Sequence, residues 1–577
     1  MTALRYSVFL GSAMVAVATG TAAALGHLSW LCSILPGILM LIGIYDVTQT
    51  RHSILRNYPI LGHMRFLLES IRPELRQYLW DSDTDEAPFS RLQRSVVYQR
   101  SKNELDSRAF GTELDVREEG HEWLSHSMSP TKITGQDFRV TVGAGRKRPY
   151  SMSVFNISAM SFGALSANAI RALNRGAKMG GFAHDTGEGS LSKYHRENGG
   201  DIIYQVASGY FGCRKADGSF DPDKFAELAA LDQVKMIEVK LSQGAKPGHG
   251  GVLPAGKVTK EIAETRGVPL GQDCVSPSSH SEFSNPVGLL HFIERLRNLS
   301  DGKPVGIKMC VGHAWEVLAL VKAMLETDII PDFIVVDGAE GGTGAAPMEF
   351  ADHVGTPLQE GLLLVHNTLV GAGLRDRVHI GASGKSVTAF DIARNIALGA
   401  SWVNSARAFM FSLGCIQSLS CNSGRCPTGV ATQDPDRQKA LIVPDKAERV
   451  FNFHRNTMHA LKELLEAAGL NHPSELRPYH IVRRVSSYSV KLLSELLDYL
   501  EPGDLLNGNY RYPVYQKYWD KVNGSSFSMT GVPETARTSS LSPGRSASGG
   551  GTNSRVVWMQ VEAHQDSRQL EELHDAQ

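Results

Sequence analysis

The stretch that decides the fold of this chain runs from Val378 to Arg407 and reads VHIGASGKSVTAFDIARNIALGASWVNSAR. Two short apolar runs, Val378–Ala382 and Trp402–Asn404, enclose the segment Val387–Leu398, in which apolar residues recur at helical spacing. Short apolar runs bounded by Gly, Ser or Asn are typical of buried strands, and a helix between two such runs is typical of a parallel sheet. The stretch therefore predicts a strand–helix–strand unit of an α/β protein.

The same pattern recurs through residues 130–440. Further short apolar runs lie at Val154–Ile157, Gly181–His184, Ile202–Val206, Met236–Leu241, Val305–Met309 and Phe333–Asp337. Amphipathic segments such as Ser166–Lys178 and Trp315–Leu325 separate several of them. Eight strand–helix repeats predict a (β/α)8 barrel, in which ligands bind at the carboxyl ends of the strands. A doubly wound open sheet is the alternative.

The last two predicted strands each lead into small residues and a cation. Backbone N–H groups at the start of a helix favour an anion, and barrels commonly hold a phosphate after strands seven and eight. An open sheet would instead carry its phosphate loop after the first strand. The late position favours the barrel and predicts a phosphate site made by Gly381, Ser383, Gly384, Lys385, Ser405 and Arg407.

Three cysteines follow this stretch, in the segment Gly414–Pro427, with the spacing C-x5-C-x4-C and a closing proline. Three thiolates on one loop can hold three irons. A zinc site would want a fourth Cys or His, usually spaced C-x2-4-C, and no His, Asp or Glu lies between Cys415 and Cys426. We expect Cys415, Cys421 and Cys426 to bind an iron–sulfur cluster; a tight loop of buried cysteines is the alternative.

A phosphate site beside an iron–sulfur loop indicates flavin mononucleotide (FMN), because a flavin exchanges both single electrons and hydride. Lys308 lies inside the apolar strand candidate Val305–Met309. A lysine within an apolar strand is unusual for a surface charge, and a cation there can stabilise negative charge on a reduced flavin ring. Lys308 is therefore predicted to contact the cofactor.

Composition narrows the class of protein further. The chain has 577 residues with a formal net charge of −1 and no basic block, which argues against a nucleic-acid partner. Its seven cysteines are an odd number, and three are spaced as metal ligands. This pattern indicates a reducing compartment rather than a disulfide scaffold.

The N-terminus reads as a membrane hairpin. No Asp, Glu, Lys or Arg lies between Arg5 and Asp46, and the apolar runs Tyr6–Gly26 and Leu28–Tyr45 are each close to the length that spans a bilayer. The tip between them carries no Lys or Arg, so the positive-inside rule places both ends in the cytoplasm. We expect a multi-pass protein of the inner (cell) membrane with a cytoplasmic catalytic domain. A cleaved signal peptide is the alternative.

These observations divide the chain into five parts. Residues 1–50 form the hairpin, residues 51–125 a membrane-proximal linker with helices, and residues 126–440 the barrel with the cysteine loop. Residues 441–522 are predicted to form a helical extension, with helices over Asp445–Ala468 and Val490–Tyr499. Residues 523–577 are rich in Ser, Gly and Thr and predict a disordered tail. Within the linker, Tyr58–Trp80 is interpreted as a first helix packed on the domain, with an interfacial helix as the alternative.

Several stretches in residues 130–440 resemble the flavin domain of glutamate synthase. They are Ser158–Ala164, Thr186–Gly189, Lys240–Gly248, Gly341–Ala345 and Gly414–Gln433, in consistent order. The resemblance implies a (β/α)8 barrel that binds FMN and a 3Fe-4S cluster held by the three cysteines. It also implies that Ser158, Ala159, Met160, Gly342 and Gly344 contact the flavin.

The resemblance further implies a substrate site. In that family 2-oxoglutarate and ammonia give 2-iminoglutarate, which reduced flavin converts to glutamate. The matching positions are Glu188, Gln243 and Lys246, with Arg266 as a further match. Lysine and arginine suit a dicarboxylate, Gln243 can hydrogen-bond an oxo or imino group, and Glu188 can hold ammonia or handle protons.

This sequence also departs from the family pattern. A membrane hairpin stands where glutamate synthase carries an amidotransferase domain, and His249 replaces an acidic residue. Ammonia is then expected to be free or to come from a separate amidotransferase. Because no convincing dinucleotide fingerprint follows a strand, electrons are expected from ferredoxin or a reductase subunit.

Three functions remain open. The first is glutamate formation by an FMN and iron–sulfur oxidoreductase, with N-methylglutamate-synthase-like chemistry as a related possibility. The second is a 2-hydroxy-acid oxidase-like flavoenzyme, which would need a histidine base such as His313, His353 or His379. The third is a non-catalytic electron-transfer module that kept its cofactors.

Overall fold

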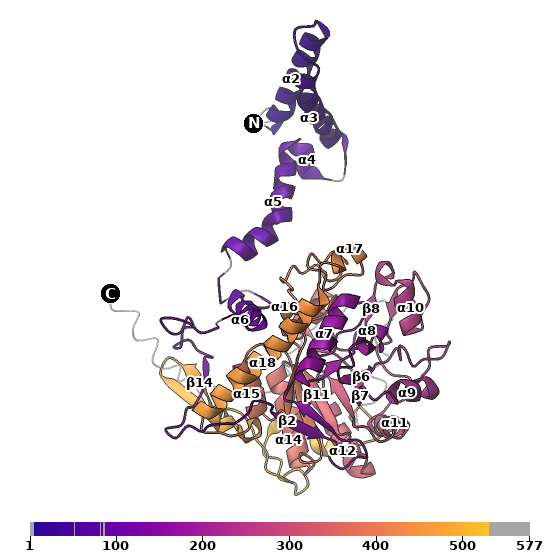
Figure 1. The fold of residues 1–577 in the computed structure, drawn as a ribbon, viewed down its shortest axis with the longest axis vertical. Helices are drawn as coiled ribbons and strands as arrows, with labels where there is room; N and C mark the ends of the chain where they lie inside the picture. The colour runs from indigo at the N-terminus through magenta and orange to yellow at the C-terminus, as the bar shows by residue number, and fades with distance from the viewer. Residues whose placement is uncertain (1–4, 51, 81, 85–86, 105, 530–577) are drawn as a thin grey trace, which may run out of the picture. The chain divides into compact units, whose positions relative to one another are not determined.

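The computed structural model describes the chain except residues 1–4, 51, 81, 85–86, 105 and 530–577 (Figure 1). Most of the predicted disordered tail therefore lies outside the described residues. Two compact units are present, Met1–Leu92 and Gln93–Gln577. The second unit contains the predicted barrel.

Eight parallel strands close into a barrel, which confirms the predicted fold. Closure comes from β13 pairing with β4, for example Asn404 with Asn156. Each strand overlaps one of the predicted apolar runs. The strands are β4 (Phe155–Ile157), β5 (His184–Asp185), β6 (Ile202–Val206), β7 (Val234–Lys240), β10 (Val305–Met309), β11 (Phe333–Asp337), β12 (His379–Ser383) and β13 (Trp402–Ser405).

Helices cover the barrel, and caps define where several of them start. Ser166 accepts a hydrogen bond from the N–H of Ala169, and Thr388 with Asp391 forms a capping box. The longest helix, α18, packs on α7 (Figure 1). The main helices are α7 (Ala167–Gly180), α9 (Pro222–Ala229), α11 (Pro286–Leu299), α12 (Ala314–Thr327), α14 (Leu358–Gly371), α15 (Ala389–Ala397) and α18 (Val443–Ala467).

Shorter elements fill the loops between these helices and strands. They are α6 (Arg91–Lys102), α8 (Lys193–Arg196), β8 (Val252–Leu253), α10 (Lys260–Arg266), β9 (Cys274–Val275), α13 (Met348–His353), α16 (Arg407–Ser412), α17 (Pro435–Gln438), α19 (Leu493–Leu496) and α20 (Pro513–Tyr518). The antiparallel pair β8–β9 belongs to an excursion between β7 and β10, at the carboxyl end of β7.

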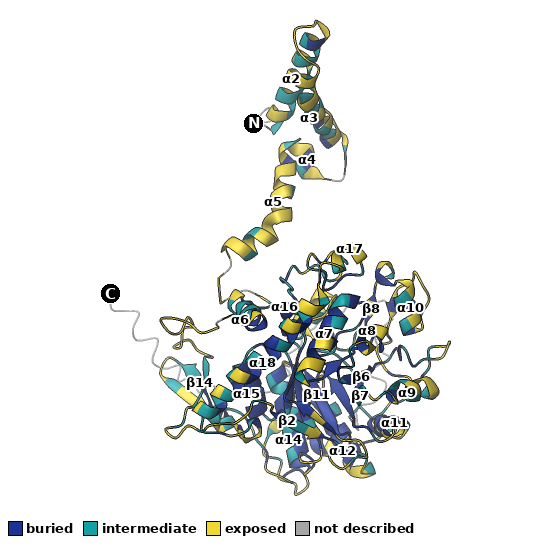
Figure 2. Ribbon diagram, viewed as in Figure 1, coloured by how far each residue is buried: buried dark blue, intermediate teal, exposed yellow. Residues whose placement is uncertain are grey.

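An apolar plug fills the amino-terminal half of the barrel. The hairpin of β2 (Arg139–Val142) and β3 (Tyr150–Ser153) contributes buried residues to this plug. The barrel strands around the plug are largely buried (Figure 2). The members of the plug are Val142, Tyr150, Met152, Ala183, Ile203, Met236, Phe333, Val335 and Trp402. Gly381 belongs to this region, because a Cβ there would meet the Trp402 indole at 2.8 Å. The structure thus places Gly381 against Trp402.

The C-terminal extension is only partly helical. The predicted helix Asp445–Ala468 matches α18, but the predicted helix Val490–Tyr499 is confirmed only over α19 (Leu493–Leu496), because β15 (Ser489–Leu492) occupies its start. This strand pairs with β14 (Ile481–Ser486), which also pairs with β1 (Glu122–Leu124). Arg483 donates to Glu122 at 2.7 Å, and Arg394 of α15 also pairs with Glu122, so the small sheet is fastened to the barrel helices.

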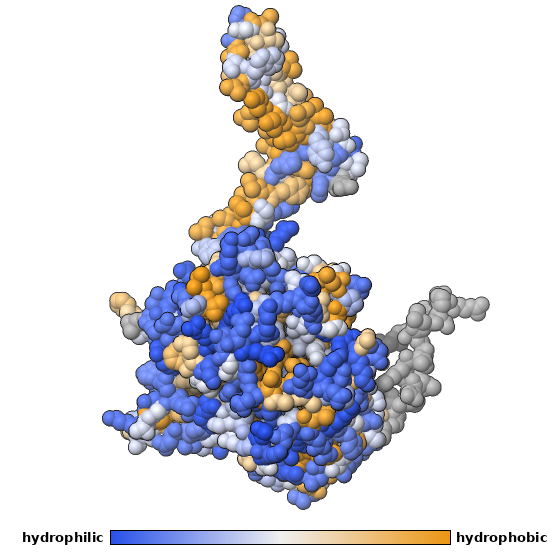
Figure 3. Space-filling view, turned by 45° about the vertical axis from the view of Figure 1, so that its right-hand side comes forward, coloured by the Kyte–Doolittle hydropathy of each residue, from blue (hydrophilic) through white to orange (hydrophobic). Residues whose placement is uncertain are grey.

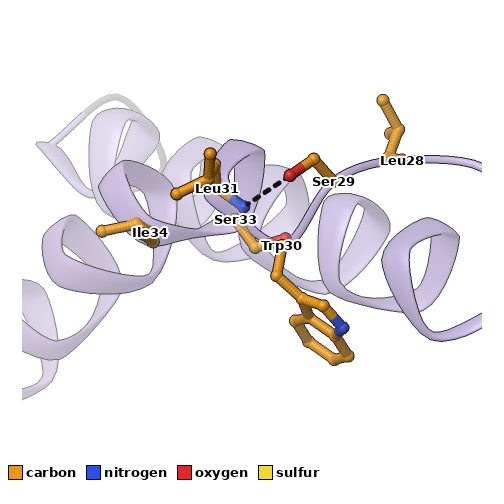
Figure 4. A pocket seen from close by; sticks show the side chains of 6 residues that line it. All are labelled: Leu28, Ser29, Trp30, Leu31, Ser33 and Ile34. Atoms are coloured by element: carbon orange, nitrogen blue, oxygen red, sulfur yellow. Dashed lines mark hydrogen bonds between the residues drawn. The ribbon is translucent and has the colours of Figure 1, made fainter.

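The first unit begins with two apolar helices, α2 (Ser7–Ala24) and α3 (Leu31–Thr48), each 18 residues long and apolar enough to cross a membrane. Apolar residues cover much of this unit's surface (Figure 3). Figure 4 shows a shallow hollow at the turn between the helices, where the N–H of Leu31 donates to Ser29 Oγ at 3.3 Å. Its lining carries no ionisable side chain, so it is not a catalytic site. Helices α4 (Ser53–Asn57) and α5 (Leu61–Leu75) follow, and a π-helical turn covers Arg76–Trp80.

Candidate active site at the carboxyl ends of the strands

Lys308 is buried inside the barrel near the carboxyl end of β10. Its Nζ lies 3.7 Å from Asp337 Oδ2 at the end of β11. Burial alone lowers the pKa of Lys308, but the charges of Asp337, Glu238 and Asp185 reverse this and raise the pKa above its ordinary value. Lys308 therefore presents a fixed positive charge, as the sequence predicts for a residue beside the cofactor.

Two buried carboxyl groups lie near Lys308. Gln205 donates to Glu238 Oε1 at 2.6 Å, and the N–H of Gly187 donates to Asp185 Oδ1 at 2.9 Å. The other oxygens, Asp185 Oδ2 and Glu238 Oε2, have no hydrogen-bond partner among the described residues. Burial and the neighbouring Glu238 raise the pKa of Asp185 well above its ordinary value. The pair is a polar layer that sequence analysis missed, because β5 and β7 are far apart in the chain.

Glu188 lies in the loop after β5 at the centre of a polar cluster. Lys240, the last residue of β7, donates to Glu188 Oε2 at 3.2 Å and to Gln243 Oε1 at 3.0 Å. Ser276 Oγ donates to the same Glu188 oxygen at 3.3 Å. Burial alone raises the pKa of Glu188, but Lys240, Arg266 and Lys246 outweigh it and the pKa falls below its ordinary value. Glu188 is therefore an ionised acceptor rather than a proton donor.

Two cations reach this cluster: Lys246 from the loop after β7, and Arg266 from the end of α10. Lys246 is buried and donates to the carbonyl of Ala345 at 3.0 Å, while burial lowers its pKa. Arg266 ends α10, is buried, and donates to the carbonyl of Phe162 at 3.0 Å. Its Nε has no hydrogen-bond partner among the described residues. The four predicted substrate residues thus lie together, and Lys240 and Ser276 join them as residues that the sequence did not single out.

Gly251 shows how closely the backbone approaches this cluster. A Cβ at Gly251 would lie 2.1 Å from Glu188 Oε1. A larger residue at Gly251 would displace the Glu188 carboxylate, so the excursion that contains β8 and β9 lies directly against it. The same excursion carries Arg266 and Ser276, which makes it one wall of the site.

The opposite pKa changes of Asp185 and Glu188 give a stability test. Asp185 binds its proton more tightly when folded, so it makes the free energy of unfolding fall as pH rises above about 4. Glu188 binds its proton less tightly when folded, so its contribution is present above about pH 4 and is lost on acidification. We expect Asp185→Asn to lose less stability than wild type as pH rises, and Glu188→Gln to lose less as pH falls. Urea unfolding midpoints measured across this pH range would contradict the assignment if both variants showed the same pH dependence of stability as the wild type.

A second group of cations lies where β12 and β13 end. Arg407 is half-buried, donates to the carbonyl of Glu340 at 2.7 Å, and has its pKa lowered to about 10 by burial. Burial and the nearby Arg407 also lower the pKa of Lys385. Lys385 has a left-handed φ of 44° in the turn after Ser383-Gly384. Lys385 and Arg407 thus lie close enough to repel each other. A phosphate dianion between them would bind both cations and relieve this repulsion.

The remaining predicted flavin residues divide into two sets. Ser158 Oγ lies 3.4 Å from Ser383 Oγ, and Ser405 Oγ donates to the carbonyl of Ser386 at 2.7 Å, so these serines lie at adjoining strand ends. Ala159 and Met160 follow Ser158 in the loop after β4. In the loop after β11, a Cβ at Gly342 would lie 2.9 Å from Arg407, whereas one at Gly344 would meet nothing within 4 Å. A side chain at position 344 would therefore point into open space.

The cysteine loop follows α16 and contains no disulfide. Tyr98 donates to the carbonyl of Cys415 at 2.6 Å, and Lys257 donates to that of Cys421 at 2.6 Å. Gln417 and Leu419 both have a left-handed φ, 58° and 55° respectively. No three His, Cys, Asp or Glu side chains in the described part of the chain converge on a single metal position. A three-iron cluster places each thiolate on its own iron, so it does not require the three thiols to meet at one point.

The residues present fit both expected cofactors. Lys385, after β12, and Arg407, after β13, suit the phosphate of FMN, and Lys308 lies at the strand ends where a ring would bind. Three thiols without a competing carboxylate or imidazole in the loop form a donor set for iron and sulfide. Lys257 was missed by sequence analysis, because it lies far from the cysteines in the chain.

The histidines considered for an oxidase do not gather at the site described above. His379 begins β12, at the opposite end of that strand from Ser383, and His313 stacks on Trp315 at a ring distance of 4.0 Å. His353 is exposed at the end of α13. None of the three is therefore positioned as the expected base.

A barrel with cationic strand ends and a three-cysteine loop defines a class of cofactor-dependent oxidoreductases. The sequence profile described as "Conserved region in glutamate synthase" matches residues 130–471, which is more than half of the chain. The chain belongs to the glutamate synthase family of oxidoreductases.

Three relatives illustrate the extent of the similarity. Glutamate synthase large subunit-like protein YerD of Bacillus subtilis is 40% identical over 496 residues, covering 79% of this chain and 94% of YerD. Archaeal-type glutamate synthase (NADPH) of Thermotoga maritima is 38% identical over 340 residues, covering 58% of this chain and 64% of that protein. Archaeal glutamate synthase (NADPH) of Methanocaldococcus jannaschii is 39% identical over 322 residues, covering 56% and 60%. The chain thus spans nearly all of YerD but less than two thirds of the archaeal-type enzymes.

Proposed function

We propose that this chain reduces 2-iminoglutarate, formed from 2-oxoglutarate and ammonia, to L-glutamate, using FMN and a 3Fe-4S cluster. The observation that carries the proposal is the grouping of Glu188, Gln243, Lys246 and Arg266 at one barrel mouth, beside Lys308, in a member of the glutamate synthase family. When bound, FMN would supply hydride and the cluster would supply single electrons.

The charges of the site suit a dicarboxylate. Lys246 and Arg266 are buried cations that both act on Glu188, so they face a common space. Burial strengthens their attraction for substrate carboxylates, and arginine can bind a carboxylate with two parallel hydrogen bonds. We assign them to binding the two carboxylates of 2-oxoglutarate.

Glu188 and Gln243 are assigned to the nitrogen chemistry. An ionised Glu188 can accept hydrogen bonds from ammonium and then from the protonated imine, which holds the nitrogen against C2. When the imine forms, C2 loses its oxygen as water. Gln243 can donate to that oxygen through its amide nitrogen, because Lys240 already holds its Oε1. Lys240 is therefore a positioning residue for both side chains.

Electrons are proposed to enter through the cysteine loop. The donor would be a ferredoxin or a reductase subunit, and ammonia would be free or supplied by a separate amidotransferase. The apolar helices α2 and α3 support a proposed location in the cell membrane as a hairpin, with the barrel in the cytoplasm.

The function is tested with anaerobically purified full-length protein in detergent. Reduced methyl viologen, 2-oxoglutarate and ammonium should give L-glutamate, measured by chiral chromatography. Methylammonium in place of ammonium should give little N-methylglutamate. Oxidation of a 2-hydroxy acid without glutamate formation would contradict the proposal, and so would a cofactor-loaded protein that forms no amino acid.

A further inference from the structure

Helix α5 carries an apolar stripe that the described residues of its own unit, Met1–Leu92, leave exposed. We use "α5 stripe" for Leu61, Met64, Leu67, Leu68 and Ile71, which are 41%, 59%, 61%, 55% and 39% exposed. Their spacing of three, three, one and three residues places them on one face of a helix. Figure 2 shows α5 as an exposed helix. The sequence-based preference for a helix packed on the domain stays a prediction.

Basic residues accompany the α5 stripe. Residues 53–80 contain four arginines and two glutamates, with no lysine or aspartate. Arg65 and Arg72 lie seven residues apart on one edge of the stripe, and Arg65 also pairs with Glu69 at 2.7 Å. The turn after α5 exposes Tyr78, Leu79 and Trp80 at 58%, 66% and 71%. Arginine beside apolar and aromatic side chains matches the boundary between lipid headgroups and acyl chains.

The start of α5 is fastened to the end of the second apolar helix. Asp46, in the last turn of α3, is fully buried and accepts the N–H of Ile60 at 2.9 Å and His63 Nε2 at 2.9 Å. Ile60 has a φ of 69°, which is rare for a β-branched residue and persists only where its surroundings fix it. The Asp46 contacts thus hold α5 at a set angle to α3.

We propose that α5 and the turn Arg76–Trp80 lie in the interface of an anionic bilayer, with the α5 stripe against the acyl chains. The inference rests on the proposed membrane hairpin, because Asp46 ties α5 to helix α3. Anionic lipid is chosen over a second copy of the chain, because the arginines beside the stripe would repel their counterparts across a symmetric dimer. Arginine near an anionic surface also adds to the apolar burial.

The test uses full-length protein in lipid nanodiscs of phosphatidylglycerol or phosphatidylcholine. Leu68→Cys reports the α5 stripe, and Ser70→Cys is its matched control, because residues two apart lie on opposite sides of a helix. Gly37→Cys reports the hairpin, since a Cβ there meets nothing within 4 Å. Alkylation by a membrane-impermeant maleimide is read peptide by peptide, so the native cysteines are resolved.

We expect the thiol of the Leu68→Cys variant to react at least about 10-fold more slowly in phosphatidylglycerol than in phosphatidylcholine discs. The thiol of Ser70→Cys should react equally in both lipids, and that of Gly37→Cys should be protected in both. Adding Arg65→Gln and Arg72→Gln to Leu68→Cys should remove the lipid difference at position 68.

The outcomes that contradict the inference differ from those that contradict the hairpin. Equal labelling at positions 68 and 70, with position 37 protected, would overturn the inference and leave the hairpin intact. Free labelling at position 37 would overturn the hairpin itself. Protection at position 68 that rises with protein concentration in detergent would overturn the inference by assigning the stripe to a second copy.

Discussion

Replacing Cys421 by serine is expected to remove the iron–sulfur cluster and abolish glutamate formation driven by a one-electron donor. Serine is a poor ligand for iron beside two thiolates, and the loop offers no His, Asp or Glu as a substitute between Cys415 and Cys426. Iron per chain should fall from about three to near zero. FMN should stay bound, because Lys385 and Arg407, which are expected to hold its phosphate, lie outside the cysteine loop. Iron analysis and the visible spectrum of anaerobic protein measure both.

The matched control for this variant is Cys310→Ser. Cys310 is also buried, and its thiol lies outside the cysteine loop, 3.8 Å from the carbonyls of Val311 and Thr356. Iron content should not change in this control. A Cys421→Ser protein that keeps its iron would show that the loop is not the cluster site.

Replacing Lys246 by methionine is expected to raise the KM for 2-oxoglutarate by about 10- to 100-fold, with a smaller effect on kcat. A charge-assisted hydrogen bond is worth about 1.5–3 kcal/mol, and each 1.4 kcal/mol corresponds to about a factor of ten in affinity. Methionine keeps the length of the buried side chain but removes the charge and the bond to the Ala345 carbonyl. Steady-state kinetics at saturating ammonium measure the change.

Lys257→Met is the matched control, since Lys257 is a second buried lysine whose pKa is lowered by burial. It contacts the cysteine loop and not the Glu188 cluster, so the KM for 2-oxoglutarate should stay at the wild-type value. If both variants changed KM equally, Lys246 would have no special role in binding the substrate.

Most of the barrel could be predicted from sequence, because its strands are fully buried and read as continuous apolar runs. Runs such as Ile202–Val206 and Phe333–Asp337 match their strands residue for residue. Gly181–His184 overlaps β5 only at His184, because Gly181 is instead the left-handed cap that ends α7. The Val490–Tyr499 segment is helical only over α19, because its first residues pair with β14 as part of β15, and tertiary pairing overrides local periodicity.

The candidate site was predicted less completely than the fold. Glu188, Gln243 and Lys246 stand in stretches that resemble a family, so the sequence alone marks them. Lys240 begins such a stretch but was not singled out, and Asp185 lies outside these stretches. Their importance comes from neighbours that barrel closure brings together from other strands. Gly381 stands in a phosphate-like motif and also makes room for the Trp402 ring, a contact that the motif does not reveal.

The most direct test of the account is the cofactor content of the full-length protein, purified under strictly anaerobic conditions. The account predicts about one FMN and about three irons per chain, with a flavin absorbance band and the electron paramagnetic resonance signal of an oxidised three-iron cluster. A folded protein that contains neither flavin nor iron, and takes up neither on reconstitution, would contradict it.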